Sequence, residues 1–443
     1  MKARLVPLYY ERPDDPDFLR QVGHLNRLLS SEAEVLPPVA LGAALPADAD
    51  AAVFPQMLGR AYGRLRDIQA LKLPILVITS EFGTLSMWDW EINTYLRSEG
   101  VKLLAPNTLE QALKFCKACA LKRGLKDAKM QVYQDNPGQG FQAEIFKRFY
   151  WWEQECIDRL RAKFGVTVSR KSFKDLGEAA KQIPDAEAEA AWSLRKDTVP
   201  TAGLGRRPLL SAMKMYLAVK RDLDQDPSIV AAGINCLNES HFSDTTPCLA
   251  WNLLFEDRRI VWGCEADLVS MMTELLIHEA LRVPFMMSNL YPFLMGQTAL
   301  KHEHIPYFPQ VASEPENHVL VAHCGYLGVL PQSFAVDWKL KPKVLAIVDD
   351  NAHAMDARLQ EGDITLVKLM PPFDTLSVVE ATLESYAQFE NSDCLNGAVV
   401  RVPNGPNMLK QLASHHYILT AGKNLQDLEG VAQIFDMECK VLV

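Results

Sequence analysis

Over the first 128 residues, short apolar runs alternate with longer stretches in which apolar residues recur at helical spacing. The runs at 3–10, 51–57, 74–80 and 101–106 are typical of buried strands. Helical patterns cover 16–31, 57–71, 89–98 and 108–124. Strands that alternate with helices form a parallel sheet covered on both faces. Ligands of such sheets bind beyond the carboxyl ends of the strands. The segment at 79–91, TSEFGTLSMWDWE, follows a predicted strand and falls at such an end.

A second alternating series begins near residue 128. It contains predicted strands at 128–135, 166–173 and 228–237, with predicted helices at 141–165, 183–194 and 207–225. Beyond a further predicted helix at 266–282, β-branched runs recur between 318 and 422 with few helical patterns, which is typical of an antiparallel barrel or sandwich. We therefore predict an α/β protein. Two doubly wound parallel-sheet domains, 1–128 and 129–265, are followed by a β-rich, barrel-like domain over 266–443.

Composition narrows the class of protein. A chain of 443 residues with a net charge of −9 is long enough for two or three domains and too acidic for binding to a phosphate backbone. No apolar run has the length of a membrane helix, and the amino terminus lacks a signal-peptide pattern. Several of the nine cysteines lie inside apolar runs, as buried free thiols do in a reducing compartment. We expect a cytoplasmic protein that binds neither nucleic acid nor membrane.

Three carboxylates stand where predicted strands end. Glu265 and Asp267, in CEAD, follow the run IVWGC, and Glu239 follows the run VAAGINCL. Asp267 also precedes LVSMMTELLI, so it is a candidate N-cap of the next helix. Two acids this close either repel each other or share a cation, and hard divalent cations select oxygen ligands. The local pattern leaves both readings open.

Histidines at strand ends favour the metal reading. His323 follows the apolar run VLVA, and His415 and His416 lie in a predicted strand. Successive strand residues point to opposite faces, so only one of this pair can face a given pocket. A single histidine of this kind is more often a core or rim residue. Carboxylates together with imidazoles make a mixed oxygen and nitrogen ligand set, which suits Mn²⁺, Mg²⁺ or Co²⁺ better than a cysteine-rich zinc site.

Three segments resemble the L-fucose isomerase and L-arabinose isomerase superfamily. They are WGCEADLVSMMTELL at 262–276, VAHCG at 321–325, and ASHHYILTAGKNLQDLEGVAQIFDMECKVL at 413–442. The last is the most specific, because it extends over thirty residues. Two α/β domains followed by a β-rich domain is also the architecture of that superfamily.

The resemblance implies roles for the candidate residues. It implies that Glu239, Glu265 and Asp267 are catalytic carboxylates that also bind the metal together with His416. Substrate contacts are expected from His323, which is also a candidate ligand, and from His415, Trp88 and Gln56. In a direct alignment back from CEAD, however, the second acid of the family falls near Cys248 rather than on Glu239.

The implied activity is aldose–ketose isomerisation of an unphosphorylated sugar through an enediol, with Mn²⁺ the favoured ion and Mg²⁺ or Co²⁺ as alternatives. The sugar would be of the fucose or arabinose type, or a modified hexose such as a sulfosugar. The resemblance also implies a homo-oligomer, trimer or hexamer, with the active site near a subunit interface. The alternatives are a catalytically silent sugar-binding relative, which the cysteine at the expected acid position favours, and a metal-dependent epimerase or aldolase.

Overall fold

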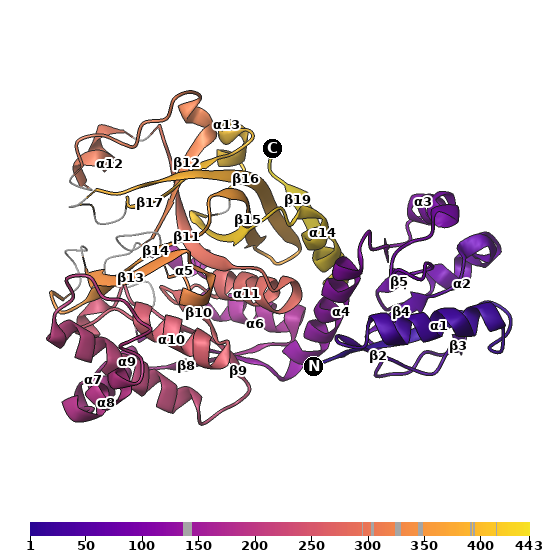
Figure 1. Ribbon diagram of the computed structural model, residues 1–443, viewed down its shortest axis with the longest axis horizontal. Helices are drawn as coiled ribbons and strands as arrows, with labels where there is room; N and C mark the ends of the chain where they lie inside the picture. The colour runs from indigo at the N-terminus through magenta and orange to yellow at the C-terminus, as the bar shows by residue number, and fades with distance from the viewer. Residues whose placement is uncertain are drawn as a thin grey trace. The chain divides into compact units, whose positions relative to one another are not determined.

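The computed structural model confirms the predicted α/β class with a β-barrel (Figure 1). It describes residues 1–135, 144–294, 296–302, 305–323, 329–343, 349–389, 392, 395–412 and 414–443. The chain divides into two compact units, of which the first comprises Met1–Lys126, Glu279–Arg282 and Gln426–Cys439 and the second the remainder. The predicted domain boundaries at 128 and 265 stay predictions. Within the described ranges, no helix combines the length and the apolar character needed to cross a membrane.

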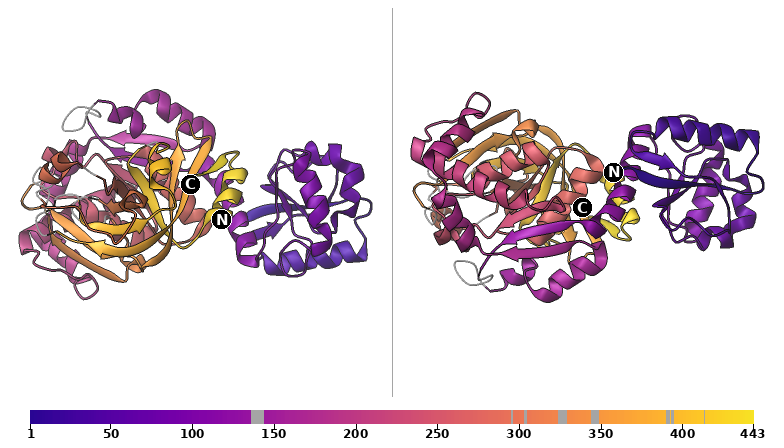
Figure 2. Two further views of the ribbon diagram at one scale, coloured as in Figure 1. Left: turned by 90° about the horizontal axis from the view of Figure 1, so that it is seen from above. Right: turned by 90° about the horizontal axis from the view of Figure 1, so that it is seen from below.

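The first unit is built around a parallel sheet with the strand order β2-β1-β4-β5-β6, and β3 pairs with β1. Figure 2 shows this sheet, in indigo and violet, enclosed between helices. Asp15 caps the first helix by accepting hydrogen bonds from the amides of Asp17 and Phe18, and Thr108 caps α4 in the same way. The strands are β1 (Ala3–Tyr9), β2 (Ala33–Val35), β3 (Val39–Ala40), β4 (Ala51–Phe54), β5 (Ile75–Val77) and β6 (Leu103–Leu104). The helices are α1 (Pro16–Leu28), η1 (Leu58–Arg64), α2 (Leu65–Gln69), η2 (Met87–Asp89), α3 (Trp90–Ser98), α4 (Leu109–Gly124) and η3 (Leu125–Asp127).

The second unit opens with a four-stranded parallel sheet in the order β10-β9-β7-β8. Its strands are β7 (Lys129–Tyr133), β8 (Thr167–Lys171), β9 (Ile229–Ile234) and β10 (Val261–Cys264). Its helices are α5 (Phe146–Phe149), α6 (Gln154–Phe164), α7 (Phe173–Gln182), α8 (Asp185–Ser193), α9 (Arg206–Leu223), η4 (Ser240–Phe242), α10 (Cys248–Arg258) and α11 (Leu268–Leu276), with α11 followed by the π-helical turn η5 (Ile277–Leu281). Gly233 and Gly263 let α11 lie close to the sheet, because a Cβ at either position would collide with Met271 of that helix.

The prediction of a single helix over 141–165 is wrong. The described part of this segment forms α5 and α6, and Trp151 between them has a left-handed φ of 60°. Tyr150, Trp151 and Trp152 are all buried. The Trp152 indole donates a hydrogen bond to the carbonyl of Ala266, 3.0 Å away. Burial of these aromatic side chains outweighs the helical periodicity of the segment, because a continuous helix would carry the three rings to different sides.

The rest of the second unit is a closed antiparallel barrel of six strands in the order β15-β18-β11-β12-β17-β16, with β16 pairing back to β15. A seventh strand, β19, continues from β16. The strands are β11 (Phe285–Pro292), β12 (His318–Ala322), β15 (Gly362–Met370), β16 (Thr375–Ala387), β17 (Gly397–Arg401), β18 (His416–Ala421) and β19 (Glu438–Val441). A separate hairpin pairs β13 (Asp337–Pro342) with β14 (His353–Arg358). The remaining helices of this unit are α12 (Gln297–His302), η6 (Pro315–Asn317), η7 (Gln332–Phe334) and α13 (Gly405–Leu409). Helix α14 (Leu425–Ile434) belongs to the first unit from Gln426 onward.

Candidate metal centre

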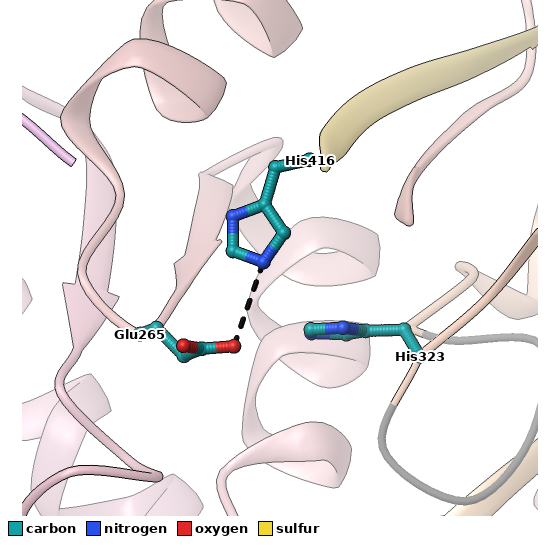
Figure 3. Close-up of side chains that lie close together, drawn as sticks. All are labelled: Glu265, His323 and His416. Atoms are coloured by element: carbon teal, nitrogen blue, oxygen red, sulfur yellow. Dashed lines mark ion pairs between the residues drawn. The ribbon is translucent and has the colours of Figure 1, made fainter. Parts of the chain in front are cut away.

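Three strand ends bring Glu265, His323 and His416 together (Figure 3). Glu265 directly follows β10, His323 directly follows β12, and His416 is the first residue of β18. Strand β11 lies between the two histidine-bearing strands, and its Asn289 pairs with both Ala322 and His416. The antiparallel register therefore places two imidazoles from distant parts of the sequence at one level of the barrel.

Glu265 reaches the group through an unusual turn. Glu265 and Ala266 have φ values of 56° and 53°, in the left-handed region that non-glycine residues seldom occupy. The hydroxyl of Tyr150 donates to the Glu265 carboxylate at 3.0 Å. Trp152 holds the Ala266 carbonyl as described above. Two consecutive left-handed residues cost conformational energy, and their occurrence beside a buried carboxylate is typical of a functional site.

The geometry fits a metal ion. One ligand atom from each of Glu265, His323 and His416 lies within 4.8 Å of the others, and all three residues are buried. His416 Nε2 lies 3.5 Å from a Glu265 oxygen, and the rings of the two histidines stand nearly perpendicular with centroids 5.7 Å apart. Neither ring nitrogen of His323, nor His416 Nε2, has a hydrogen-bond partner among the residues that the structure describes. Buried nitrogens without partners are costly unless a ligand completes them, so this group could hold a metal ion.

Asp267 links helix α11 to His416 by hydrogen bonds. It is the N-cap of α11, as the N-cap reading predicted, and accepts hydrogen bonds from the amides of Val269 and Ser270 at 2.9 and 3.0 Å. Its second oxygen contacts Ser270 Oγ at 2.7 Å, Lys368 Nζ at 3.2 Å and His416 Nδ1 at 2.9 Å. A carboxylate on Nδ1 fixes the orientation of an imidazole and leaves Nε2 for the ligand. The structure thus brings Asp267 next to His416 but outside the group of three.

Burial and neighbouring charges shift the pKa values of the three candidate ligands in different directions. Burial lowers the pKa of His416, but Asp267 and Glu265 outweigh it and raise that pKa, so a metal ion at Nε2 would displace a proton. Burial raises the pKa of Glu265, but the nearby His416, whose Nε2 lies 3.5 Å from the carboxylate, outweighs it and lowers that pKa to about 2. Burial and the neighbouring His416 lower the pKa of His323 to about 4, so this imidazole is neutral at pH 7. Burial and the Glu265 charge raise the pKa of the Tyr150 phenol well above its usual value, which keeps it a donor. An ionised carboxylate and a neutral imidazole are the states that bind metals.

The other predicted site residues lie elsewhere. Glu239 is buried at the carboxyl edge of the same sheet, where its two oxygens accept from the amide of Asp135 at 3.1 and 3.0 Å. His415 is half-buried against Phe146, with ring centroids 6.0 Å apart. Trp88, 69% exposed on η2, and Gln56, which follows β4, both belong to the first unit. Within the described residues, none of these four is part of the Glu265 group.

Two contributors were not predicted from the sequence. Tyr150 lies in the aromatic cluster FYWW, within the segment for which the periodicity predicted a single helix. Lys368 is buried in the middle of the apolar strand DITLVKLM, and an unpaired lysine there would be costly, so its position was the available signal. Comparison with known proteins gives no match to a family model and none to a curated protein. The chemistry assigned to the site rests on its own residues.

Proposed function

We propose that this protein is a metal-dependent aldose–ketose isomerase that acts on an open-chain, unphosphorylated sugar. The observation that supports the proposal is the buried group of Glu265, His323 and His416, in which both His323 nitrogens and His416 Nε2 lack a hydrogen-bond partner among the described residues. The resemblance to the L-fucose and L-arabinose isomerase superfamily implies the same activity. Sugars of the fucose and arabinose type, and modified hexoses such as sulfosugars, are the substrates to test first.

Glu265, His323 and His416 would hold the ion, and we propose Mn²⁺, because the donor set mixes one carboxylate with two imidazoles. A bound divalent ion supplies Lewis acidity toward the carbonyl and hydroxyl oxygens at C1 and C2 of the sugar. Asp267 keeps the His416 ring in place, and Lys368 compensates the charge of Asp267. All five side chains are buried, which shields the proposed site from bulk water.

Carboxylates would move the proton. Isomerisation moves one proton from C2 to C1 and a second proton from O2 to O1, so it requires groups that accept a proton at one position and return it at the other. Glu265 is ionised and touches the proposed ion site. We assign Glu239 as the second carboxylate, because it is buried at the same edge of the sheet, one strand away from Glu265. Asp267 is assigned to positioning His416 rather than to proton transfer.

Metal analysis and a sugar panel test the proposal. Purified protein should contain close to one divalent ion per chain, and should convert one or more of the pentoses, 6-deoxyhexoses or sulfonated hexoses to a ketose. Glu265→Gln should keep the fold, by circular dichroism, and lose both the ion and turnover. Glu178→Gln, at an exposed position on α7, is the matched control and should keep both. A metal-free protein without activity on the panel would favour a silent sugar-binding relative, and other products would indicate an epimerase or aldolase.

A further inference from the structure

A row of three polar side chains follows three neighbouring strands of the second parallel sheet. Ile234 at the end of β9 pairs with Cys264 on one side and Tyr133 on the other. The next residues on the three strands are Glu265, Asn235 and Gln134. The backbone hydrogen bonds of the sheet continue through Asn235 and Gln134. The backbone amide of Asn235 donates to the Tyr133 carbonyl at 3.0 Å, and the backbone amide of Gln134 donates to the Lys171 carbonyl at 2.9 Å.

The strand pleat places Asn235 and Gln134 on the face that carries α11. Side chains two residues apart on a strand share a face. Gly233 faces Met271 of α11 and pairs with Val132, so Asn235 and Gln134, each two residues further on, belong to this face. Tyr133 points the other way, and its hydroxyl donates to Asp222 of α9 at 2.6 Å. The N-cap of α11 is Asp267, which binds His416, so the two amides share the face of the sheet on which the metal group is built.

Neither side-chain amide has a hydrogen-bond partner in the part of the chain that the structure describes. Gln134 is 5% exposed and Asn235 is fully buried. The oxygen and the nitrogen of both side-chain amides lack any hydrogen bond among the described residues. The Asn289 oxygen, on the strand between the two histidines, lacks one as well. Buried amides left unpaired destabilise a protein, so their presence here indicates groups that a ligand completes.

The strand order of the second parallel sheet also indicates a ligand site at this carboxyl edge. Along the chain, β8 is added on one side of β7 and β9 on the other, so the strand order reverses between β7 and β9. Ligands of doubly wound sheets bind at the carboxyl edge where this reversal occurs. Gln134 directly follows β7 and Asn235 directly follows β9. The two unpaired amides therefore flank the expected ligand crevice.

We propose that Gln134 and Asn235 bind the hydroxyl groups of a neutral polyol chain, whose reacting end lies at Glu265, His323 and His416. This inference rests on the proposed function and assigns the tail-recognition residues. A carboxamide both donates and accepts, as a hydroxyl group does. With strands about 4.8 Å apart, Asn235 stands one spacing and Gln134 two spacings from Glu265, so a linear chain can extend along the row. A phosphorylated tail would instead require cationic partners.

Linear alditols provide the test, because they carry the hydroxyl groups of an open-chain sugar and cannot isomerise. Calorimetric titration of Mn²⁺-loaded protein with a panel of pentitols and hexitols, and with a hexitol 6-phosphate, should find a neutral binder. Gln134→Met and Asn235→Leu should each weaken that alditol about tenfold or more, since each leaves hydroxyl groups unpaired. Both variants should keep Mn²⁺ affinity within about twofold and should equal or exceed the wild-type Tm, because they remove an unpaired buried amide.

Gln131→Met is the matched control. Gln131 is a buried glutamine on the same strand, but it lies on the opposite face and bonds Ser169 and the Val132 carbonyl. This variant should lower the Tm and leave alditol affinity unchanged, the reverse of the result at Gln134. If an apolar variant does not fold, Gln134→Glu and Asn235→Asp, which keep size but lose the NH₂ donor, should also weaken the alditol.

Different failures separate the two proposals. Absence of divalent-ion binding by the wild-type protein would reject the proposed function. Normal Mn²⁺ binding with no alditol bound, with unchanged alditol affinity in the Gln134 and Asn235 variants, or with tighter binding of the phosphorylated hexitol, would overturn the amide assignment and leave the metal centre standing.

Discussion

The carboxyl edges of the two parallel sheets share a topology but differ in their surroundings. Beyond β5 in the first unit, the loop and η2 expose Phe82 at 70% and Trp88 at 69%. At the corresponding edge of the second unit, Glu265 and Asn235 are buried. The difference arises because β12 and β18 of the barrel bring His323 and His416 to the second edge. A doubly wound sheet fixes where a ligand can bind, and the element that covers the edge decides which chemistry is possible.

The largest expected effect separates the two edges by metal affinity. His323→Ala and His416→Ala each remove a proposed ligand and should lower Mn²⁺ affinity beyond detection. Asp267→Asn keeps the helix cap but weakens the partner of His416, so it should lower affinity roughly 10–100-fold. Trp88→Ala, at the first edge, should leave metal affinity unchanged. Calorimetric Mn²⁺ titration measures all four, and equal losses in the Trp88 and His416 variants would contradict the metal-centre assignment.

The next contrast compares how much a buried ion pair and an exposed ion pair contribute to the free energy of unfolding. Lys368 is 1% exposed and compensates Asp267, so Lys368→Met should destabilise the protein by about 3–5 kcal/mol, because it removes one partner of a buried pair. Arg60→Met breaks the Arg60–Glu11 pair of the first unit, whose side chains are 64% and 60% exposed, and should cost less than about 1 kcal/mol. Urea unfolding of both variants compares them. A loss at Lys368 no larger than that at Arg60 would show that Asp267 does not need its cation.

A third contrast concerns the stability of the fold at acidic pH. His353 is buried, with Nε2 accepting from the Leu249 amide at 3.0 Å, and burial lowers its pKa from 6.5 to about 4. The unfolded chain therefore takes up this proton first, so stability is retained above pH 6.5 and is lost as the pH falls toward 4. The loss should reach about 3 kcal/mol near pH 4.

His353→Gln isolates this contribution, because glutamine keeps an acceptor that does not titrate. The variant should show a shallower decline of unfolding free energy between pH 6.5 and 4 than the wild type. Parallel profiles for wild type and His353→Gln would exclude His353 as an acid-sensitive group.

Local pattern was sufficient for the architecture and for part of the site. Strand and helix periodicity predicted both parallel sheets and the barrel, because burial of one face imposes these periods directly. Glu265 and His323 could be identified because a charged or imidazole side chain directly after an apolar run is costly to bury without a partner. The resemblance to the isomerase superfamily, and not the local pattern, singled out His416 as a ligand. The double role of Asp267, as helix cap and as partner of His416, depends on a contact between residues 149 positions apart, which no local pattern contains.

Other features needed three-dimensional register. Gln134 and Asn235 each follow a strand directly, and amide side chains at such positions are common in turns, so the sequence did not single them out. Only the pairing of Ile234 with both neighbouring strands shows that they stand in one row with Glu265. Tyr150 was hidden in a segment with helical periodicity, because the tertiary burial of three adjacent aromatic residues breaks the helix. The sequence therefore indicates which residues are expensive to bury, and the register shows which of them meet.

The smallest expected effect tests whether the first edge takes part in catalysis at all. Trp88 is largely exposed, so Trp88→Ala should change the free energy of unfolding by less than about 0.5 kcal/mol. If Trp88 contacts the sugar, as the family resemblance implies, KM should rise roughly 3–10-fold with kcat unchanged, because stacking of the indole stabilises bound substrate and transition state alike. Gln56→Ala, two residues beyond β4, should behave similarly. Steady-state kinetics that leave KM unchanged in both variants would assign substrate recognition to the second edge alone, where Asn235 and Gln134 lie.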